Sequence, residues 1–464
     1  MKKIVVLGGG SSGLSVAWQI ALSKQGKVDI YEKSDRAGGV CGYHDFNGIK
    51  LDYGPHKIYS ILPGLMDTFK SIPNLNLKEV KKKHRIIMRG ATLDYPVKMV
   101  QMFSLFSLPE ILAVGFSVFN TIIKSPFLKE AVSYEDYCIG VFGKKIYEVV
   151  FKPLAEKTWG NPKLLSADIA KTRIPTKSVF DLIARMIGLK RESVSTDAEV
   201  MLYPARGFSD IYECMAENIK AMGHTIHLGT KPIKFIRTGK KVGAVVFDDK
   251  SEIGTDLVIS SIPLVELVAM LFPEDKDIAK ERFIHMRHSV IAYLLVDRPK
   301  VMEDHWDFCT DKDILFSRIS EQKLLANENF PKDKTVVACD FTCDGESSIW
   351  QEKGAVIAKR CVQDLERLKV LKKESVISWQ VIKIPSFYPV YEIGYENKLR
   401  TLIEKINRVE NVICTGRLGL CGYNNVDHGL DMGIFCAKEL AKGKSPANIN
   451  NALLERARTY RIVD

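Results

Sequence analysis

The stretch that decides the fold is KKIVVLGGGSSGLSVAWQIALSKQGKVDIYEKS, residues 2–34. It begins with the apolar run 4–7, which is typical of a strand buried on both faces of a parallel sheet. Three glycines follow in the G-x-G-x-x-G spacing, Gly8, Gly10 and Gly13. Glycines at these places allow a tight turn, let backbone N–H groups approach a pyrophosphate and bring the next helix close to the strand.

The same stretch holds the acidic residue that dinucleotide folds use. A helix that opens after the glycine turn points the positive end of its dipole at the phosphates. The second strand, 28–31, ends at Glu32, which follows Gly13 by 19 residues. A carboxylate at this place can accept hydrogen bonds from both ribose hydroxyl groups of an adenosine. The predicted dinucleotide contacts of this stretch are Gly8, Gly10, Ser12, Gly13 and Glu32.

Length, composition and charge are those of a soluble globular protein of roughly two to four domains. The chain has 464 residues, 46% of them hydrophobic and 27% charged, which excludes disordered and fibrous classes. The net charge of +11 is spread along the chain, so we expect no nucleic-acid partner. Ten irregularly spaced cysteines predict a reducing, cytoplasmic location, and neither they nor the histidines form a metal motif. We expect no bound metal, and the residues before the glycine turn are too few for a signal peptide.

One long apolar stretch, residues 99–123, has the length of a membrane-spanning helix, which needs about 20 apolar residues. Pro109 and the acid after it are a helix-start signal in the middle of this stretch. We therefore predict two short apolar helices, 97–108 and 109–124. They form either a buried helical pair in a substrate domain or a surface, 97–124, that dips into the bilayer to collect a lipid-linked substrate. The second alternative makes the protein membrane-associated. A segment that spans the membrane is the remaining alternative.

The residues that follow the acid, EKSDRAGGVCGY at 32–43, bring a second glycine pair. An acid, a basic residue and two glycines in this order resemble the extended FAD fingerprint of the flavoprotein superfamily that includes amine oxidases, phytoene desaturases, protoporphyrinogen oxidase and UDP-galactopyranose mutase. A second glycine pair lets the backbone reach more of the phosphate and ribityl chain, which a nicotinamide dinucleotide does not need. The resemblance implies non-covalently bound FAD, with Lys33, Gly38, Gly39 and Val40 among its contacts.

A block in the middle of the chain is similar to the same superfamily. It reads YPARGFSDIYECMAENIKAMGHTIHLGTKPIKFI, residues 203–236. Gly207 opens a helix with an apolar face, and residues 225–235 are predicted to form a strand pair. The resemblance implies that Ile233 lies beside the adenine, with its backbone groups facing the base. The segment that follows is similar to the meander and strand that close the sheet.

A third block, NVICTGRLGLCGYNNVDHGLDMGIFCAKEL at 411–440, has a buried strand, then a Gly-Arg pair, then a helix. In an open parallel sheet a ligand lies at the carboxyl ends of the strands. The resemblance implies that Gly416 and Arg417 contact the FAD pyrophosphate or the substrate. It also implies that Asn425 and Val426 present backbone N–H groups to the pyrimidine edge of the flavin. A helix N-terminus at that edge stabilises the negative charge of reduced flavin.

Three segments narrow the resemblance to the group around UDP-galactopyranose mutase and its protoporphyrinogen-oxidase-like and amine-oxidase-like relatives. They are 134–175, YPVYEIGY at 388–395 and GRLGLCGYNNVDH at 416–428, and the match covers most of the chain outside about 265–380. The resemblance implies a catalytic set at the flavin ring and in the substrate pocket, made of His56, Trp159, Tyr391 and Arg417. Asp427 and His428 are either an acid and a base or, for Asp427, a helix cap.

Two reaction classes fit this group. In an oxidoreductase a substrate C–H bond gives a hydride to flavin N5, and the substrate is a small molecule such as a glycosyl or lipid-linked compound. In a redox-neutral sugar mutase two arginines hold the diphosphate of a nucleotide sugar, and Arg417 matches one of them. Lys177 stands at the other place, and a lysine lacks bidentate phosphate geometry. We therefore predict an FAD-dependent oxidoreductase, with the mutase as the alternative and a non-catalytic flavin-binding partner of a membrane assembly as a third class.

The fold class that follows is α/β, a Rossmann-like FAD-binding domain of the GR2 flavoprotein type with a helical insert and a mixed β-sheet substrate domain. The FAD-binding domain is predicted to be discontinuous, and the active site is predicted where the three parts meet. The predicted divisions are 1–95, 200–262 and 385–464 for the FAD-binding domain, 96–199 for the helical insert and 263–384 for the substrate domain.

Overall fold

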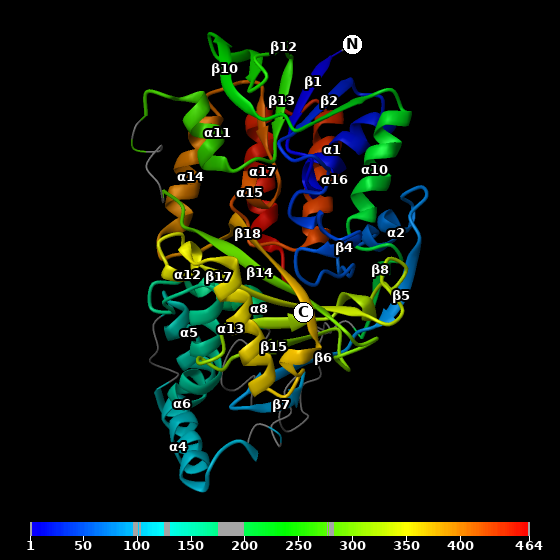
Figure 1. The fold of residues 1–464 in the computed structure, drawn as a ribbon. Coiled ribbons are helices and arrows are strands. Elements are labelled where there is room, and N and C mark those ends of the chain that lie inside the picture. The colour runs from blue at the N-terminus through cyan, green and yellow to red at the C-terminus, as the bar shows by residue number, and fades with distance from the viewer. Residues whose placement is uncertain are drawn as a thin grey trace.

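A computed structural model describes residues 2–95, 101, 104–124, 130–174, 199–275, 277 and 283–462. Three parts follow one another from top to bottom in Figure 1: a parallel α/β part, a broad mixed sheet and a helical part. This arrangement confirms the predicted α/β class with a helical insert and a second, mixed sheet.

The α/β part is built on a parallel five-stranded sheet in the order β19-β13-β1-β2-β9. Its strands are β1 (Lys3–Leu7), β2 (Lys27–Glu32), β9 (Thr225–Leu228), β13 (Leu257–Ser260) and β19 (Val412–Cys414). The apolar run that opens the chain is buried along β1, as the sequence predicts. Its helices are α1 (Ser11–Leu22), α2 (Leu65–Lys70), α10 (Asp210–Ala221), α11 (Leu264–Leu271), α14 (Tyr395–Ile406), α15 (Gly416–Gly419), α16 (Val426–Ala441) and α17 (Pro446–Thr459). Helix α1 contacts both α10 and α16 (Figure 1).

The predicted strand pair at 225–235 is wrong. Strand β9 runs parallel to β2 in the five-stranded sheet, whereas the next strand belongs to a separate three-stranded meander. The chain leaves the first sheet at a turn where Gly229 has a φ of +67° and Thr230 N–H donates to the Glu32 carbonyl. The meander consists of β10 (Pro232–Thr238), β11 (Lys241–Phe247) and β12 (Glu252–Gly254).

A seven-stranded mixed sheet, in the order β18-β14-β17-β16-β15-β6-β7, forms the middle of the molecule. Its strands are β6 (His84–Met88), β7 (Ala91–Asp94), β14 (Met286–Val296), β15 (Trp306–Cys309), β16 (Arg318–Ser320), β17 (Thr335–Cys343) and β18 (Val376–Pro389). The predicted domain division stays a prediction. Strands β6 and β7 lie in the segment 1–95 predicted for the FAD-binding domain, but they join the seven-stranded sheet. Helices α12 (Ser348–Gln351) and α13 (Gly354–Arg367) follow β17. Two further sheets have two antiparallel strands each: β3 (Tyr43–Phe46) with β4 (Ile49–Asp52), and β5 (Leu77–Lys81) with β8 (Val200–Pro204).

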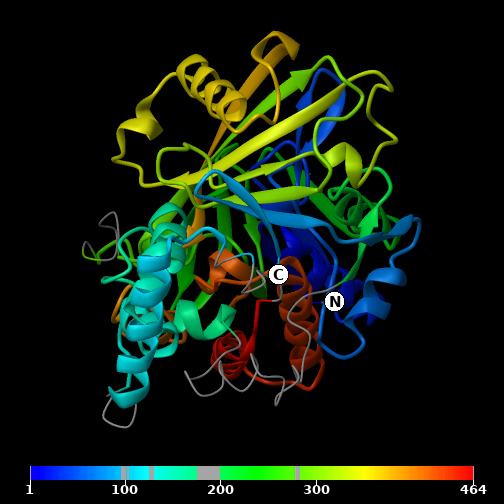
Figure 2. The same ribbon diagram turned by 90° about the horizontal axis from the view of Figure 1, so that it is seen from below.

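The helical part has an apolar core of its own. Its helices are α4 (Leu108–Lys124), α5 (Tyr134–Phe142), α6 (Lys144–Ile146), α7 (Lys152–Thr158) and α8 (Ala167–Arg173). The second of the two predicted apolar helices is therefore present, one residue longer at its start. Half of the first, 97–108, lies outside the described residues. Seen from below, α4 stands away from the body of the molecule (Figure 2).

Candidate functional site

The glycine turn between β1 and α1 leaves no room for side chains. A Cβ atom on Gly13 would lie 1.9 Å from the carbonyl oxygen of Gly8, and one on Gly8 would lie 2.4 Å from Ser261 Oγ. Gly8 also has a φ of +96°, which favours glycine. Gly10 is the N-cap of α1, and this helix starts without an acidic residue in its first turn. Its first N–H groups are therefore suited to a phosphate.

Glu32 is fixed beside this turn. Its Oε2 accepts from the N–H of Gly9 at 2.7 Å, and its Oε1 accepts from the N–H of Ser34 at 2.9 Å. The side chain is buried at the carboxyl end of β2. A carboxylate has about four acceptor positions, so two remain for ribose hydroxyl groups. The geometry thus fits the adenosine-binding role that the sequence predicts for Glu32.

The second glycine pair packs against the first turn. The N–H of Gly38 donates to the carbonyl of Gly9 at 2.8 Å, and a Cβ atom on Gly39 would lie 3.1 Å from Gly10 Cα. Both glycines have positive φ values, +115° and +56°. Two backbone turns therefore approach each other at one edge of the sheet. Of their predicted neighbours, Lys33 is exposed directly after β2, and Val40 is half-buried in the turn Gly39–Cys41.

Ser12 and Gly416 lie where α1 meets α16. The hydroxyl of Ser12 donates to the carbonyl of Gly429 at 2.7 Å, and a Cβ atom on Gly416 would lie 2.8 Å from Ser12 Oγ. The observed contacts give Ser12 a role in holding α16 on α1, and its role toward a cofactor stays a prediction. The hydroxyls of Ser260 and Thr415, at the carboxyl ends of β13 and β19, are buried without a hydrogen-bond partner among the described residues. These polar atoms lie at the edge where a ligand of such a sheet binds.

The start of α16 is fixed by two contacts. The N–H of Asn425, its N-cap, donates to Nδ1 of His428 at 3.1 Å. The guanidinium of Arg417 donates from Nε to the carbonyl of Asn424 at 3.1 Å and lies over the Tyr388 ring, 5.2 Å from its centroid. His428 is therefore used in capping. Asp427 accepts from Ser60 Oγ at 2.7 Å, so neither of the two needs a catalytic role to explain its position.

A cavity of about 230 Å³, hereafter the central cavity, opens between the three parts of the molecule. Arg417, Asn425 and Val426 line it on the side of α16. Its other walls come from the segment 53–59 after β4 and from β6, β15, β16, β17, β18, α7 and α8. Most of its large side chains are aromatic: Tyr53, Tyr59, Tyr95, Trp159, Trp306, Phe308, Phe341, Tyr388 and Tyr423. An aromatic cavity with a few polar groups is the usual form of a small-molecule site.

Three arginines line the central cavity: Arg173, Arg318 and Arg417. The guanidinium carbon of Arg173 lies 5.0 Å from the ring centroid of Trp159 and 4.8 Å from that of Tyr423. Its Nη2 also donates to Tyr423 Oη at 3.0 Å. Asp340 pairs with Arg318. Among the described residues that line the cavity, three arginines and Lys57 outnumber two aspartates, Asp340 and Asp427, and this excess of basic side chains suits an anionic ligand.

His56 and Trp159 bring buried polar atoms to the central cavity. His56 Nδ1 and Trp159 Nε1 are both buried without a hydrogen-bond partner among the described residues. The His56 ring stacks on Phe208 at 4.8 Å between centroids. Burial, together with the positive charges of Arg318 and Arg417, lowers the pKa of His56 to about 3. His56 is therefore a neutral imidazole that can hydrogen-bond a ligand.

Tyr391 is placed one layer behind the central cavity. Its hydroxyl accepts from the N–H of Tyr423 at 2.6 Å, and its ring stacks on Tyr395 at 4.1 Å. It thus supports Tyr423, which does line the central cavity. Ile233 lies on β10 with about half of its surface exposed. Lys177 lies outside the described residues.

Sequence reasoning missed Arg173, Arg318 and Asp340 as cavity residues. Arg173 lies in the segment TRIP, residues 172–175, four residues before Lys177. The available signal was that Arg173 ends the helix predicted to start at Ser166, in the same segment as Trp159. Arg318 and Asp340 face each other across neighbouring strands β16 and β17, which no local pattern reveals.

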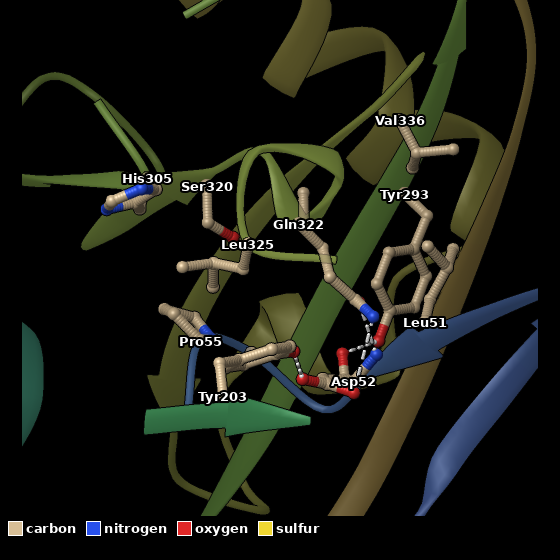
Figure 3. A pocket seen from close by; sticks show the side chains of 12 residues that line it. Leu51, Asp52, Pro55, Tyr203, Tyr293, His305, Ser320, Gln322, Leu325 and Val336 are labelled. Atoms are coloured by element: carbon tan, nitrogen blue, oxygen red, sulfur yellow. Dashed lines mark hydrogen bonds between the residues drawn. The ribbon is translucent and has the colours of Figure 1, made fainter. Parts of the chain in front are cut away.

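A second, much smaller cavity of about 10 Å³ lies beside Asp52 (Figure 3). It can hold at most a water molecule. Asp52 accepts from the hydroxyl of Tyr203 and, at 3.1 Å, from the N–H of Phe208. Its own N–H donates to Gln322 Oε1 at 2.7 Å, and its carbonyl accepts from Tyr293 Oη at 2.7 Å. This network joins β4 to β8, β14 and the turn after β16, so it is structural.

Comparison with known proteins agrees with this geometry. The model of the NAD(P)-binding Rossmann-like domain family matches residues 6–72. A crystal structure of reduced UDP-galactopyranose mutase superposes with a TM-score of 0.82 at 18% identity, over 99% of this chain and 98% of that one. A candidate protoporphyrinogen oxidase from Exiguobacterium sp. 255-15 superposes with a TM-score of 0.74 at 16% identity, over 96% and 99% of the two chains.

Among curated relatives, phytoene desaturase of Fusarium fujikuroi is 25% identical over 305 residues, which is 59% of this chain and 51% of the desaturase. The chain thus spans about half the length of the curated relatives it matches. Similarity at this level agrees with the resemblance drawn from the sequence. The chain has the fold of the amine oxidase-like flavoprotein superfamily, with a Rossmann-like dinucleotide-binding domain in residues 6–72.

Proposed function

We propose that the protein is an FAD-dependent oxidoreductase that acts on an anionic small molecule in the central cavity. The observation that carries the proposal is the position of this cavity. The predicted flavin-edge residues Asn425 and Val426 line the same space as three arginines and an aromatic wall. FAD, when bound, supplies the acceptor for a hydride at its N5 atom. The chain's own residues then have to bind, orient and shield the substrate.

The residues present fit FAD. The two glycine turns and Glu32 form a cradle that a Cβ atom would fill, and two buried hydroxyls without partners lie at the sheet edge. Glu32 would hold the ribose, and the N–H groups at the start of α1 would hold the pyrophosphate. The N-terminus of α16 would lie at the flavin edge and favour its reduced, anionic form.

The arginines define the substrate end of the proposed site. Arg173 and Arg417 would bind the anionic group of the substrate, because both line the central cavity and both are stacked on aromatic rings. His56 cannot act as an acid near neutral pH, because its pKa is lowered to about 3. It would instead accept or donate a hydrogen bond in its neutral form. The aromatic walls would exclude water from the reacting carbon.

A sugar mutase is the second candidate, and one observation favours it. Arg173 lines the central cavity together with Arg417, so two arginines are available to bridge a diphosphate even though Lys177 is not an arginine. Such a reaction would use reduced FAD and leave its redox state unchanged. A substrate such as UDP-galactose, or a lipid-linked sugar, would carry the required diphosphate.

Anaerobic spectroscopy of the purified, FAD-loaded protein separates the two candidates. A substrate that bleaches oxidised flavin in the absence of oxygen supports the oxidoreductase, and UDP-galactose, which carries a diphosphate, is a suitable first probe. Turnover of UDP-galactose only after dithionite reduction supports the mutase. Protein that stays colourless after incubation with excess FAD contradicts both.

A further inference from the structure

The outer face of α4 is a row of large apolar side chains. Between 54% and 71% of the surface of each is exposed, and we call them the α4 stripe: Leu108, Leu112, Phe116, Phe119 and Ile123. At 100° per residue, these positions fall within an arc of about 80° on one side of the helix. The helix stands at the end of the molecule opposite the parallel sheet (Figures 1 and 2).

The opposite face of α4 already attaches the helix to the molecule. Val114 and Thr121 are buried, and Ser117 Oγ accepts from the N–H of Lys145 at 3.1 Å. The α4 stripe is therefore not needed to hold the helix in place. Single exposed apolar residues are common on protein surfaces, but a contiguous row of five marks an interaction site.

The charges around the α4 stripe point to an anionic partner. Glu110 is the only acid on α4, and it is neutralised by an ion pair of 2.9 Å with Arg89, which lowers its pKa to about 2. Lys124 ends the helix, and Lys144 extends from α6, which packs on α4. Glu148 lies 3.9 Å from Lys144 and compensates one of these charges. An apolar row bordered by lysines is typical of a helix that lies on an anionic lipid surface.

An apolar cluster lies between the base of α4 and the central cavity. Leu105, just before the helix, packs in a cluster with Ile86, Met88, Leu93 and Phe308. Two of these residues, Ile86 and Phe308, also line the central cavity. Packed apolar side chains thus join the base of α4 to the wall of the central cavity.

We propose that α4 anchors the protein to an anionic bilayer, with the α4 stripe in the boundary between head groups and acyl chains. No helix of the described residues is long and apolar enough to cross a bilayer, so the contact is with one leaflet. A second copy of the chain fits less well, because pairing two α4 stripes would bring the lysines of both copies together. This inference concerns binding and does not depend on the proposed reaction.

Flotation of the full-length protein with lipid vesicles tests the inference. The vesicles contain phosphatidylcholine alone or with about a third of phosphatidylglycerol. We expect binding to the anionic vesicles that weakens with salt, and a loss of at least about tenfold in affinity for Phe116→Ser with Phe119→Ser. The matched control is Ile377→Ser with Trp379→Ser on β18, which are also exposed and apolar but lie far from α4.

A second variant guards against loss of folding. Phe116→Trp keeps the α4 stripe apolar and should show a blue shift of its fluorescence, relative to the wild-type protein, when anionic vesicles are added. Three results would overturn the inference: no binding of the wild-type protein to anionic vesicles, equal loss in the β18 control, or a lipid-free dimer that Phe116→Ser with Phe119→Ser dissociates. The dimer would show that a second copy covers the α4 stripe.

Discussion

The guanidinium of Arg318 donates two hydrogen bonds to the carboxylate of Asp340, from Nε to Oδ2 at 2.9 Å and from Nη2 to Oδ1 at 3.0 Å. Both residues line the central cavity, on the neighbouring strands β16 and β17. The pair therefore fixes the orientation of one cavity arginine. Arg173 and Arg417 lie instead over aromatic rings, and we propose that these two bind the substrate anion.

The Arg318–Asp340 pair should contribute to stability. Asp340→Asn would leave the largely buried guanidinium of Arg318 without its counter-ion. We expect the free energy of unfolding to fall by about 2 kcal/mol, a value reduced because one side of the pair faces the solvent of the cavity. Urea denaturation measures the change. Asp35→Asn is the matched control, because it breaks the exposed pair with Arg36 and should cost less than about 0.5 kcal/mol. Equal losses in the two variants would show that burial of the pair does not matter.

Arg173 should decide the affinity for an anion. Its guanidinium lies over the rings of both Trp159 and Tyr423, and a lysine cannot reproduce these contacts. We expect Arg173→Met to weaken binding of UDP about tenfold or more, and Arg173→Lys to lie between this variant and the wild-type protein. Isothermal titration calorimetry measures the dissociation constants.

The control for Arg173 lies on the same helix. Lys171 is exposed and pairs with Glu130 at 3.3 Å, so Lys171→Met removes a positive charge from α8 without touching the central cavity. Its dissociation constant for UDP should stay within about twofold of the wild-type value. Unchanged binding by Arg173→Met, or equal weakening by Lys171→Met, would remove Arg173 from the anion site.

Glu32 should decide the affinity for FAD. The carboxylate holds Gly9 and Ser34, and Glu32→Gln replaces one acceptor oxygen by a donor that faces these N–H groups. We expect a dissociation constant for FAD at least about tenfold higher, measured by quenching of flavin fluorescence on titration of apoprotein. Asp29→Asn on the same strand β2 is the control and should bind FAD as the wild-type protein does. A normal affinity of Glu32→Gln would exclude the predicted ribose contact.

The sequence predicted best what depends on local spacing. The glycine turn, Glu32 and the strands around them follow from a pattern of about thirty residues, because a tight turn and a close backbone contact tolerate only glycine at Gly8 and Gly13. Pairing between strands that are far apart in the chain could not be predicted from the sequence. β6 and β7 join a sheet whose other strands come 200 residues later, and Arg318 meets Asp340 only through that pairing. Tyr391 was predicted in the pocket, whereas it supports Tyr423 from behind.

Asp52 should make stability depend on pH. Burial raises its pKa to about 7, whereas the ordinary value of an aspartate is 3.8. The folded state therefore binds more protons than the unfolded state between about pH 4 and pH 7, so this contribution is complete at low pH and is lost as the pH rises through 7. The free energy of unfolding should fall with pH in this window, by at most about 1.4 kcal/mol per pH unit.

Asp52→Asn imitates the protonated acid, because its oxygen can accept from the N–H of Phe208 while its amide donates to the hydroxyl of Tyr203. Urea denaturation at pH 5 and pH 8 should therefore show a smaller loss of stability for this variant than for the wild-type protein. His285, between Asp344 and Glu392, has a raised pKa and contributes with the same sign, so His285→Gln is measured beside it. If Asp52→Asn loses as much stability between the two pH values as the wild-type protein, Asp52 is ionised throughout and the network in Figure 3 holds a charge.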